Sequence, residues 1–163
     1  MRIYLIGMPG SGKSTVGRKL AKALDMAYID LDGMIEKDAL MFVESIFETL
    51  GEKKFRELET KALKEIEGES VVISCGGGVV TVKENKILMN GIKIYLDTDL
   101  DVISKRLSKD YERPLLKQKS LEQIFDERYL KYQDFADVIV SNNVDIDETV
   151  KVIMNYLTKG VQK

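Results

Sequence analysis

The chain has 163 residues, with 25 basic and 27 acidic side chains and a formal net charge of −2. This balance excludes the clustered positive surface of a nucleic-acid-binding protein, so we expect no nucleic-acid partner. The absence of histidine excludes Ser–His triads and histidine metal sites, and the single cysteine, Cys75, excludes an internal disulfide and multi-cysteine zinc sites.

The distribution of apolar residues bears on location. No stretch approaches the ~18 apolar residues that a membrane span requires. The apolar run at residues 3–6 is too short for a signal peptide. We therefore predict a cytoplasmic protein without a membrane partner, in which the one cysteine is a small buried residue. The length suits a single domain, residues 1–163, and we expect a monomer.

Segments of strand type alternate with segments of helical type along the chain. Short apolar runs predict strands at residues 3–6, 27–29, 71–74, 92–96 and 138–140. After a glycine-rich turn, helical spacing starts at Val16, and further helical stretches are expected at 33–67, 82–90, 100–107, 120–133 and about 147–158, with Gly51 as a break. This alternation predicts an α/β fold with a parallel sheet of about five strands and helices on both faces.

The turn after the first strand carries the most specific motif. Residues 7–14 match G-x-x-x-x-G-K-[ST] between a predicted strand and a predicted helix. The glycines let backbone N–H groups surround a phosphate, at the positive end of the helix. We expect Lys13 to reach the β- and γ-phosphates and Ser14 to offer its hydroxyl to Mg²⁺. The remaining predicted nucleotide contacts in this segment are Gly7, Pro9, Gly10, Ser11, Gly12 and Thr15.

Two carboxylates follow the second predicted strand. Asp30 and Asp32 leave it at the edge where ligands bind in open parallel sheets. One could hold Mg²⁺ while the other orients or deprotonates an acceptor hydroxyl; alternatively, Asp32 only caps the helix beginning near Gly33. The sequence Asp30-Leu31-Asp32-Gly33 also fits the D-x-x-G pattern of GTPases. However, the 15 residues between Ser14 and Asp30 leave no room for a switch loop.

Glycines and arginines complete the set of candidate residues. Gly76-Gly77-Gly78 follows the third strand, either as a backbone surface for a closely bound ligand or as a tight strand exit. Arg56, Arg113 and Arg128, taken singly, suit solvated or ion-paired surface positions. Together they suggest a site for an anionic acceptor and a mobile cation that closes over the phosphates.

In this order, the residues resemble the shikimate kinase family of P-loop small-molecule kinases over nearly the whole chain. After the glycine-rich loop, the resemblance rests on Asp30-Leu31-Asp32-Gly33-Met34-Ile35-Glu36, Phe55-Arg56 with Glu59, Gly76 to Gly78, Arg113-Pro114-Leu115-Leu116, and Arg128 eight residues before Ala136-Asp137. It implies transfer of the γ-phosphoryl group of ATP to the 3-hydroxyl of shikimate, a step of chorismate and aromatic amino acid biosynthesis. It also implies a three-layer P-loop kinase fold with sheet order 2-3-1-4-5 and a mobile lid at about 108–119.

The resemblance further implies a role for each matching residue. Asp32 would hold the shikimate hydroxyls and act as the candidate base. Arg56, braced by Glu59, and Arg128 would clamp the carboxylate. Arg113 would be the lid arginine that reaches the phosphates, and Arg106 would lie against the adenine. The other implied contacts are Phe47, Phe55, Gly76, Gly77 and Gly78 for shikimate, in a binding region at about 33–62, and Ser14 with Asp30 for Mg²⁺.

The sequence departs from the family pattern in two places. The family commonly has R-x-P-x-Y, whereas this chain has Arg128-Tyr129-Leu130-Lys131-Tyr132, and the proline that many members place beside the adenine is missing near 142–146. Two alternatives remain open. The first is another P-loop kinase, acting on gluconate or a nucleoside monophosphate. The second is a non-catalytic ATP-binding module.

Overall fold

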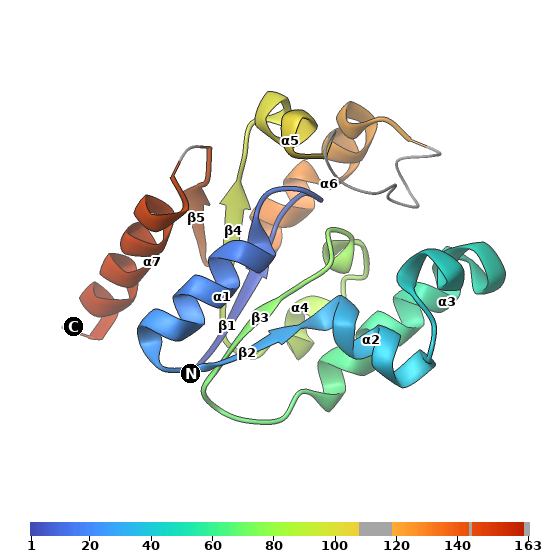
Figure 1. Cartoon of the computed structure of the whole chain (residues 1–163), viewed down its shortest axis with the longest axis horizontal. Coiled ribbons are helices and arrows are strands. Elements are labelled where there is room, and N and C mark those ends of the chain that lie inside the picture. The colour runs from blue at the N-terminus through green and yellow to red at the C-terminus, as the bar shows by residue number, and fades with distance from the viewer. Residues whose placement is uncertain (108–118, 144, 162–163) are drawn as a thin grey trace.

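The computed structural model describes residues 1–107, 119–143 and 145–161, and five parallel strands form one sheet in it (Figure 1). Their order is β2-β3-β1-β4-β5, as the resemblance implied. The strands are β1 (Arg2–Ile6), β2 (Ala27–Asp30), β3 (Val71–Ser74), β4 (Ile92–Asp97) and β5 (Val138–Ser141). Each of the five predicted strands is confirmed, with ends that differ by at most one residue.

Helices cover both faces of the sheet, which confirms the three-layer prediction. In β1, Ile3 and Leu5 point to one face and pack against α1 (Lys13–Leu24) and α7 (Ile146–Val161). Tyr4 and Ile6 alternate with them and pack on the other face, under α3 (Val43–Glu65) and α6 (Leu121–Phe135). Because both faces are buried, β1 is continuously apolar from Ile3 to Ile6.

The long helical stretch predicted at 33–67 is two helices in the structure, α2 (Leu31–Ala39) and α3. Leu40 ends α2 in the left-handed region (φ 54°), and the Glu36 carboxylate accepts a hydrogen bond from the Val43 amide at the start of α3 (3.0 Å). This reversal left no Gly or Pro signal in the sequence. The break predicted at Gly51 is confirmed as a kink within α3 (φ 85°, ψ 166°).

The stretch predicted as a helix at 82–90 is mostly irregular. It contains only the short α4 (Asn85–Leu88), after the 3-10 turn η1 (Val79–Thr81). The buried Asn85 side chain accepts from the Thr60 hydroxyl and donates to the Val79 carbonyl, each over 2.8 Å. Asn85 therefore ties this segment to α3 and η1, and these tertiary contacts replace a longer helix.

The other predicted helices are present as α5 (Leu100–Leu107), α6 and α7. In the part of the chain that the structure describes, no helix is both long and apolar enough to cross a membrane. The predicted lid at about 108–119, with Arg113 in it, lies outside the described residues except for its last position, Lys119.

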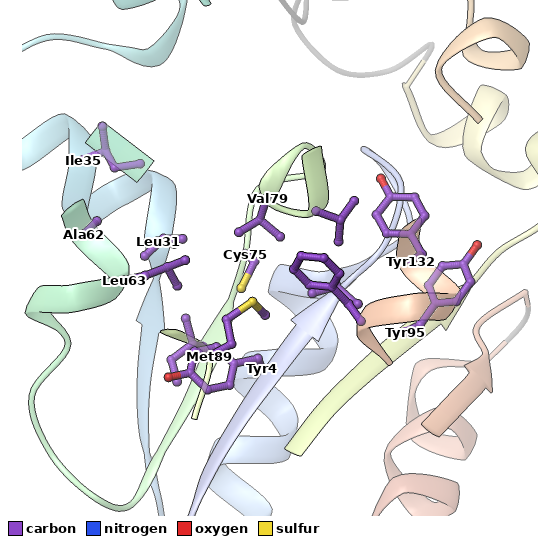
Figure 2. Packing of buried hydrophobic residues seen from close by; sticks show 14 of the residues in the cluster. Tyr4, Leu31, Ile35, Ala62, Leu63, Cys75, Val79, Met89, Tyr95 and Tyr132 are labelled. Carbon is purple, nitrogen blue, oxygen red and sulfur yellow. The ribbon is translucent and has the colours of Figure 1, made fainter. Parts of the chain in front are cut away.

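Apolar side chains fill the space between the sheet and the helices α3, α4 and α6 (Figure 2). Cys75 lies among them beside Met89, and its 3% exposure confirms that it is a small buried residue. Burial raises the pKa of this thiol above its usual range. At the other end of the cluster, the Tyr95 and Tyr132 rings stack with centroids 5.0 Å apart, and both hydroxyls point toward the carboxyl ends of the strands.

Candidate active site

The glycine-rich loop joins β1 to α1 at the carboxyl end of the sheet, as its motif requires. Gly10 (φ 80°) and Gly12 (φ 95°) occupy the left-handed region, which favours glycine, and Gly12 is the N-cap of α1. The Lys13 ammonium folds back over the loop and donates to the carbonyls of Gly7 (2.9 Å) and Met8 (2.8 Å). The loop thus joins the helix N-terminus to a buried cation, an arrangement that suits a phosphate.

The outside of this loop is held by residues that the sequence analysis missed or assigned differently. Arg106, which the resemblance placed against the adenine, donates to the carbonyls of Gly10 (3.4 Å) and Asn142 (3.1 Å). The Asn142 side chain donates to the Ser11 carbonyl over 2.6 Å. Asn142 is not part of a motif, so only the three-dimensional structure brings it to the loop.

The two predicted carboxylates occupy the junction of β2 and α2. Asp30 is the N-cap of α2, and Asp32 is the second residue of the helix. This position excludes the alternative in which Asp32 serves only as the N-cap. Asp30 pairs with Ser74 in the β2–β3 ladder, and the Ser74 hydroxyl donates to the Lys13 carbonyl over 2.8 Å. Asp30 and the first turn of α1, which contains Ser14, therefore both lie next to Ser74.

Gly76, after β3, lies against two carboxylates. A Cβ at this position would be 2.9 Å from Asp32 Oδ1 and 3.0 Å from Glu59 Oε2, so those two oxygens are at most 5.9 Å apart. Glycine is needed here because a larger residue would push one of these side chains away. The structure thus brings together the end of β3, the start of α2 and the middle of α3.

Glu59 is fully buried and forms an ion pair with Arg56 (3.1 Å). Burial raises the pKa of Glu59 to about 7, because loss of solvation outweighs the attraction of Arg56, and the Asp32 carboxylate raises it further. The carboxyl therefore changes its charge near neutral pH. The predicted contact between Glu59 and Arg56 is present in the structure.

Arg56 lies close to two aromatic rings and to the triple glycine. Phe47 and Phe55 pack with ring centroids 4.6 Å apart, and the Arg56 guanidinium carbon is 5.9 and 5.3 Å from the two centroids. A Cβ at Gly78 would lie 2.2 Å from Arg56 Nη2. The guanidinium is thus fixed by α3, its own aromatic neighbours and the backbone after β3.

Arg128 and Tyr132 come from successive turns of α6. Arg128 is 4% exposed, and its Nε–H has no hydrogen-bond acceptor among the residues that the structure describes. The Tyr132 hydroxyl donates to the Gly77 carbonyl over 2.5 Å, and burial raises its pKa to about 12. The tyrosine of the R-x-P-x-Y pattern was the only sequence signal for Tyr132, and Tyr95 had none.

The charges of the site converge on one region. Arg56 and Arg128 both act to lower the pKa values of Glu59 and Tyr132, so the two guanidinium groups lie around the same buried groups. Nε–H groups of both arginines lack an acceptor in the described part of the chain. Buried donors of this kind are stabilised by an anion. The arrangement suits a small carboxylate whose hydroxyls reach Asp32.

Comparisons with known proteins point to one family. The family model described as shikimate kinase matches residues 9–158. The chain is 41% identical over 162 residues to a shikimate kinase from a Sulfurihydrogenibium species, covering 96% of each chain. It is similar to the structure of shikimate kinase from Acinetobacter baumannii in complex with shikimate, with a TM-score of 0.89 and 33% sequence identity. The match covers 97% of this chain and 93% of that one. It is also similar to the structure of shikimate kinase from Aquifex aeolicus, with a TM-score of 0.86 and 38% sequence identity. This match covers 99% of this chain and 98% of that one.

Proposed function

The chain belongs to the shikimate kinase family and phosphorylates shikimate with ATP, and from that premise we propose which of its residues carry out the reaction. The observation that carries this assignment is a pair of arginines, the half-buried Arg56 and the buried Arg128. Their buried Nε–H groups have no acceptor in the described part of the chain, and they lie on the same side of the sheet as Asp32. The reaction transfers the γ-phosphoryl group to the 3-hydroxyl of shikimate, a step of aromatic amino acid biosynthesis.

The glycine-rich loop, residues 7–14, with Thr15, binds the phosphates of ATP. Three features support this assignment: the left-handed backbone at Gly10 and Gly12, the N-terminus of α1, and the Lys13 ammonium. Lys13 leaves the Gly7 and Met8 carbonyls for the β- and γ-phosphates when ATP binds. As the γ-phosphoryl group moves, Lys13 stabilises the charge that develops on its oxygens and on the leaving β-phosphate.

Asp32, Arg56 and Arg128 orient the acceptor. The two arginines clamp the shikimate carboxylate, and Phe47, Phe55 and the backbone of Gly76 to Gly78 enclose the ring. Asp32 accepts a hydrogen bond from the 3-hydroxyl and takes its proton as the oxygen attacks the γ-phosphorus. The bond from that phosphorus to the β–γ bridging oxygen breaks, and ADP leaves with the electron pair.

We propose Mg²⁺ as the cofactor, held by Ser14 and Asp30. The described residues contain no cluster of three His, Cys, Asp or Glu side chains that could hold a metal. This fits Mg²⁺, which usually takes only one or two protein oxygens and completes its shell with phosphates and water. Asp30 and the first turn of α1 both lie next to Ser74, and the Asp30 carboxylate and the Ser14 hydroxyl would supply such oxygens. When bound, Mg²⁺ neutralises phosphate charge.

Further assignments extend beyond these residues. We propose that residues 1–163 act as one P-loop kinase domain, in which the region at about 33–62 binds shikimate and the segment at about 108–119 is the lid. Arg113 in that segment reaches the phosphates, and Arg106 contacts the adenine in addition to the loop. We also propose that the enzyme acts as a monomer, since none of these assigned contacts requires a residue from a second chain. Its one thiol is buried, consistent with the cytoplasm.

ADP release in the presence of Mg-ATP tests the proposal, with shikimate, gluconate and AMP as parallel acceptors. We expect stimulation by shikimate alone, and its loss by orders of magnitude in Asp32→Asn and Lys13→Ala. Stimulation by gluconate or AMP instead would favour another small-molecule kinase. Tight ATP binding without acceptor-dependent turnover would favour a non-catalytic module. Full activity of Asp32→Asn would remove Asp32 from the reaction.

A further inference from the structure

A buried asparagine at the end of β5 holds the outside of the phosphate-binding loop. Asn142 is 1% exposed, and its Nδ2 donates to the Ser11 carbonyl over 2.6 Å. The Thr98 hydroxyl, just after β4, donates to the same carbonyl over 3.3 Å. We propose that Asn142 is a positioning residue for the phosphate loop. This inference rests on the proposed role of residues 7–14 in binding the phosphates of ATP.

The direction of the Ser11 carbonyl matters because the peptide between Ser11 and Gly12 is trans. In a trans peptide, the C=O and the following N–H point in opposite directions. With the carbonyl fixed toward Asn142, the Gly12 N–H points to the other side of the loop. Gly12 is the N-cap of α1, where backbone N–H groups are available to a phosphate. Asn142 therefore fixes a phosphate donor without contacting the phosphate.

A second residue fixes the orientation of the Asn142 amide. The Thr149 hydroxyl, on α7, donates to Asn142 Oδ1 over 2.7 Å, and Thr149 is 4% exposed. Since a hydroxyl donates to the oxygen of an amide, this bond turns the NH₂ end toward Ser11. Arg106 donates to the Asn142 carbonyl (3.1 Å) and the Gly10 carbonyl (3.4 Å). The loop is thereby tied to α5, β5 and α7.

The motif glycine at position 12 is also shaped by this contact. A Cβ at Gly12 would lie 2.6 Å from Asn142 Nδ2, and Gly12 has φ 95°. Glycine is thus required for two reasons, the left-handed backbone and the space that Asn142 occupies. The contact between Asn142 and the loop leaves no room for a bridging water at this point, which favours direct positioning.

Steady-state kinetics of Asn142→Ala and Thr149→Val test the inference. We expect KM for ATP to rise about tenfold in Asn142→Ala and less in Thr149→Val, because one buried hydrogen bond is lost or misdirected in each. KM for shikimate should stay within about twofold, since neither residue lies near the acceptor. Inorganic tripolyphosphate has no adenine and competes with ATP for the phosphate loop. Its inhibition constant should rise by the same factor as KM for ATP.

The adjacent asparagine supplies a matched control. Asn143 accepts from the Asp99 amide (2.7 Å) and donates to Ser141 Oγ (3.1 Å), with no bond to the phosphate loop. Asn143→Ala should leave KM for ATP unchanged. If KM for ATP rose as much in Asn143→Ala as in Asn142→Ala, the effect would belong to the β5–α7 connection as a whole, and the proposal would be overturned. An unchanged KM for ATP in Asn142→Ala, or unchanged competition by tripolyphosphate, would overturn it too. Calorimetric binding of tripolyphosphate keeps the test valid even if shikimate is not the acceptor.

Discussion

The Arg56 guanidinium lies directly against the backbone of Gly78, where a Cβ would fall 2.2 to 2.4 Å from three of its atoms. Arg56 comes from α3 and Gly78 from the segment after β3, so this contact joins two parts of the proposed acceptor site. The triple glycine is therefore more than a tight strand exit. At Gly78 it provides the space for the Arg56 guanidinium, which we propose binds the substrate.

Gly78→Ala tests this relationship. The methyl group would displace the Arg56 guanidinium from its position against Gly78 and near the two phenylalanine rings. We expect KM for shikimate to rise at least about tenfold, as expected when a buried charge-assisted contact to an anion is lost. KM for ATP should change little. Gly68→Ala is the control: Gly68 has φ 94° with nothing near its Cβ position, so the variant loses stability but keeps its KM for shikimate. Equal effects on both KM values in Gly78→Ala would contradict the local explanation.

Arg128→Lys separates charge from shape at the second arginine. Lysine keeps the positive charge but lacks the planar set of donors, including the buried Nε–H that has no acceptor within the described chain. We expect KM for shikimate to rise about tenfold or more. Arg18→Lys, at an exposed arginine 5.6 Å from the Tyr28 ring, should leave both KM values unchanged. An Arg128→Lys enzyme with normal KM would mean that charge alone suffices.

Tyr132→Phe removes one hydrogen bond and keeps the packing against Tyr95. The Gly77 carbonyl then loses its buried donor, and the backbone beside the acceptor is less well fixed. We expect a loss of stability of about 1 kcal/mol and a several-fold rise in KM for shikimate. Tyr129→Phe, on the exposed side of the same helix, is the matched control and should change neither quantity. If the two variants behave alike in urea unfolding and kinetics, the Tyr132 hydroxyl has no positioning role.

Sequence patterns predicted the elements whose residues carry a local signal. The strands were visible as apolar runs, and the glycine-rich loop as a motif between the first strand and α1. The reversal at Leu40 and the short α4 were missed, because a left-handed leucine and a buried Asn85 depend on tertiary contacts. Asn142 was missed for the same reason: its partner, Ser11, is 131 residues away in the chain. Contacts of this range can be seen only after the fold is known.

Glu59 makes the stability of the protein depend on pH. Its pKa is raised from 4.5 to about 7 by burial, so the folded protein binds this proton more tightly than the unfolded chain. The stabilisation is therefore complete below pH 4.5 and is lost as the pH rises through 7. Integrated over this window, the free energy of unfolding falls by up to about 3 kcal/mol.

Glu59→Gln removes the titrating group while keeping its size. Urea unfolding between pH 5 and pH 8 should show that the variant gains stability relative to the parent protein as the pH rises, because the parent then carries a buried charge that glutamine lacks. Glu57→Gln, at an exposed position two residues earlier in α3, should follow the parent curve at every pH. Parallel curves for Glu59→Gln and the parent would mean that Glu59 does not change its charge in this range, as expected if Arg56 and Arg128 keep it ionised. In that case the Arg56–Glu59 contact would be a permanent ion pair, and shikimate would have to bind an already neutralised Arg56.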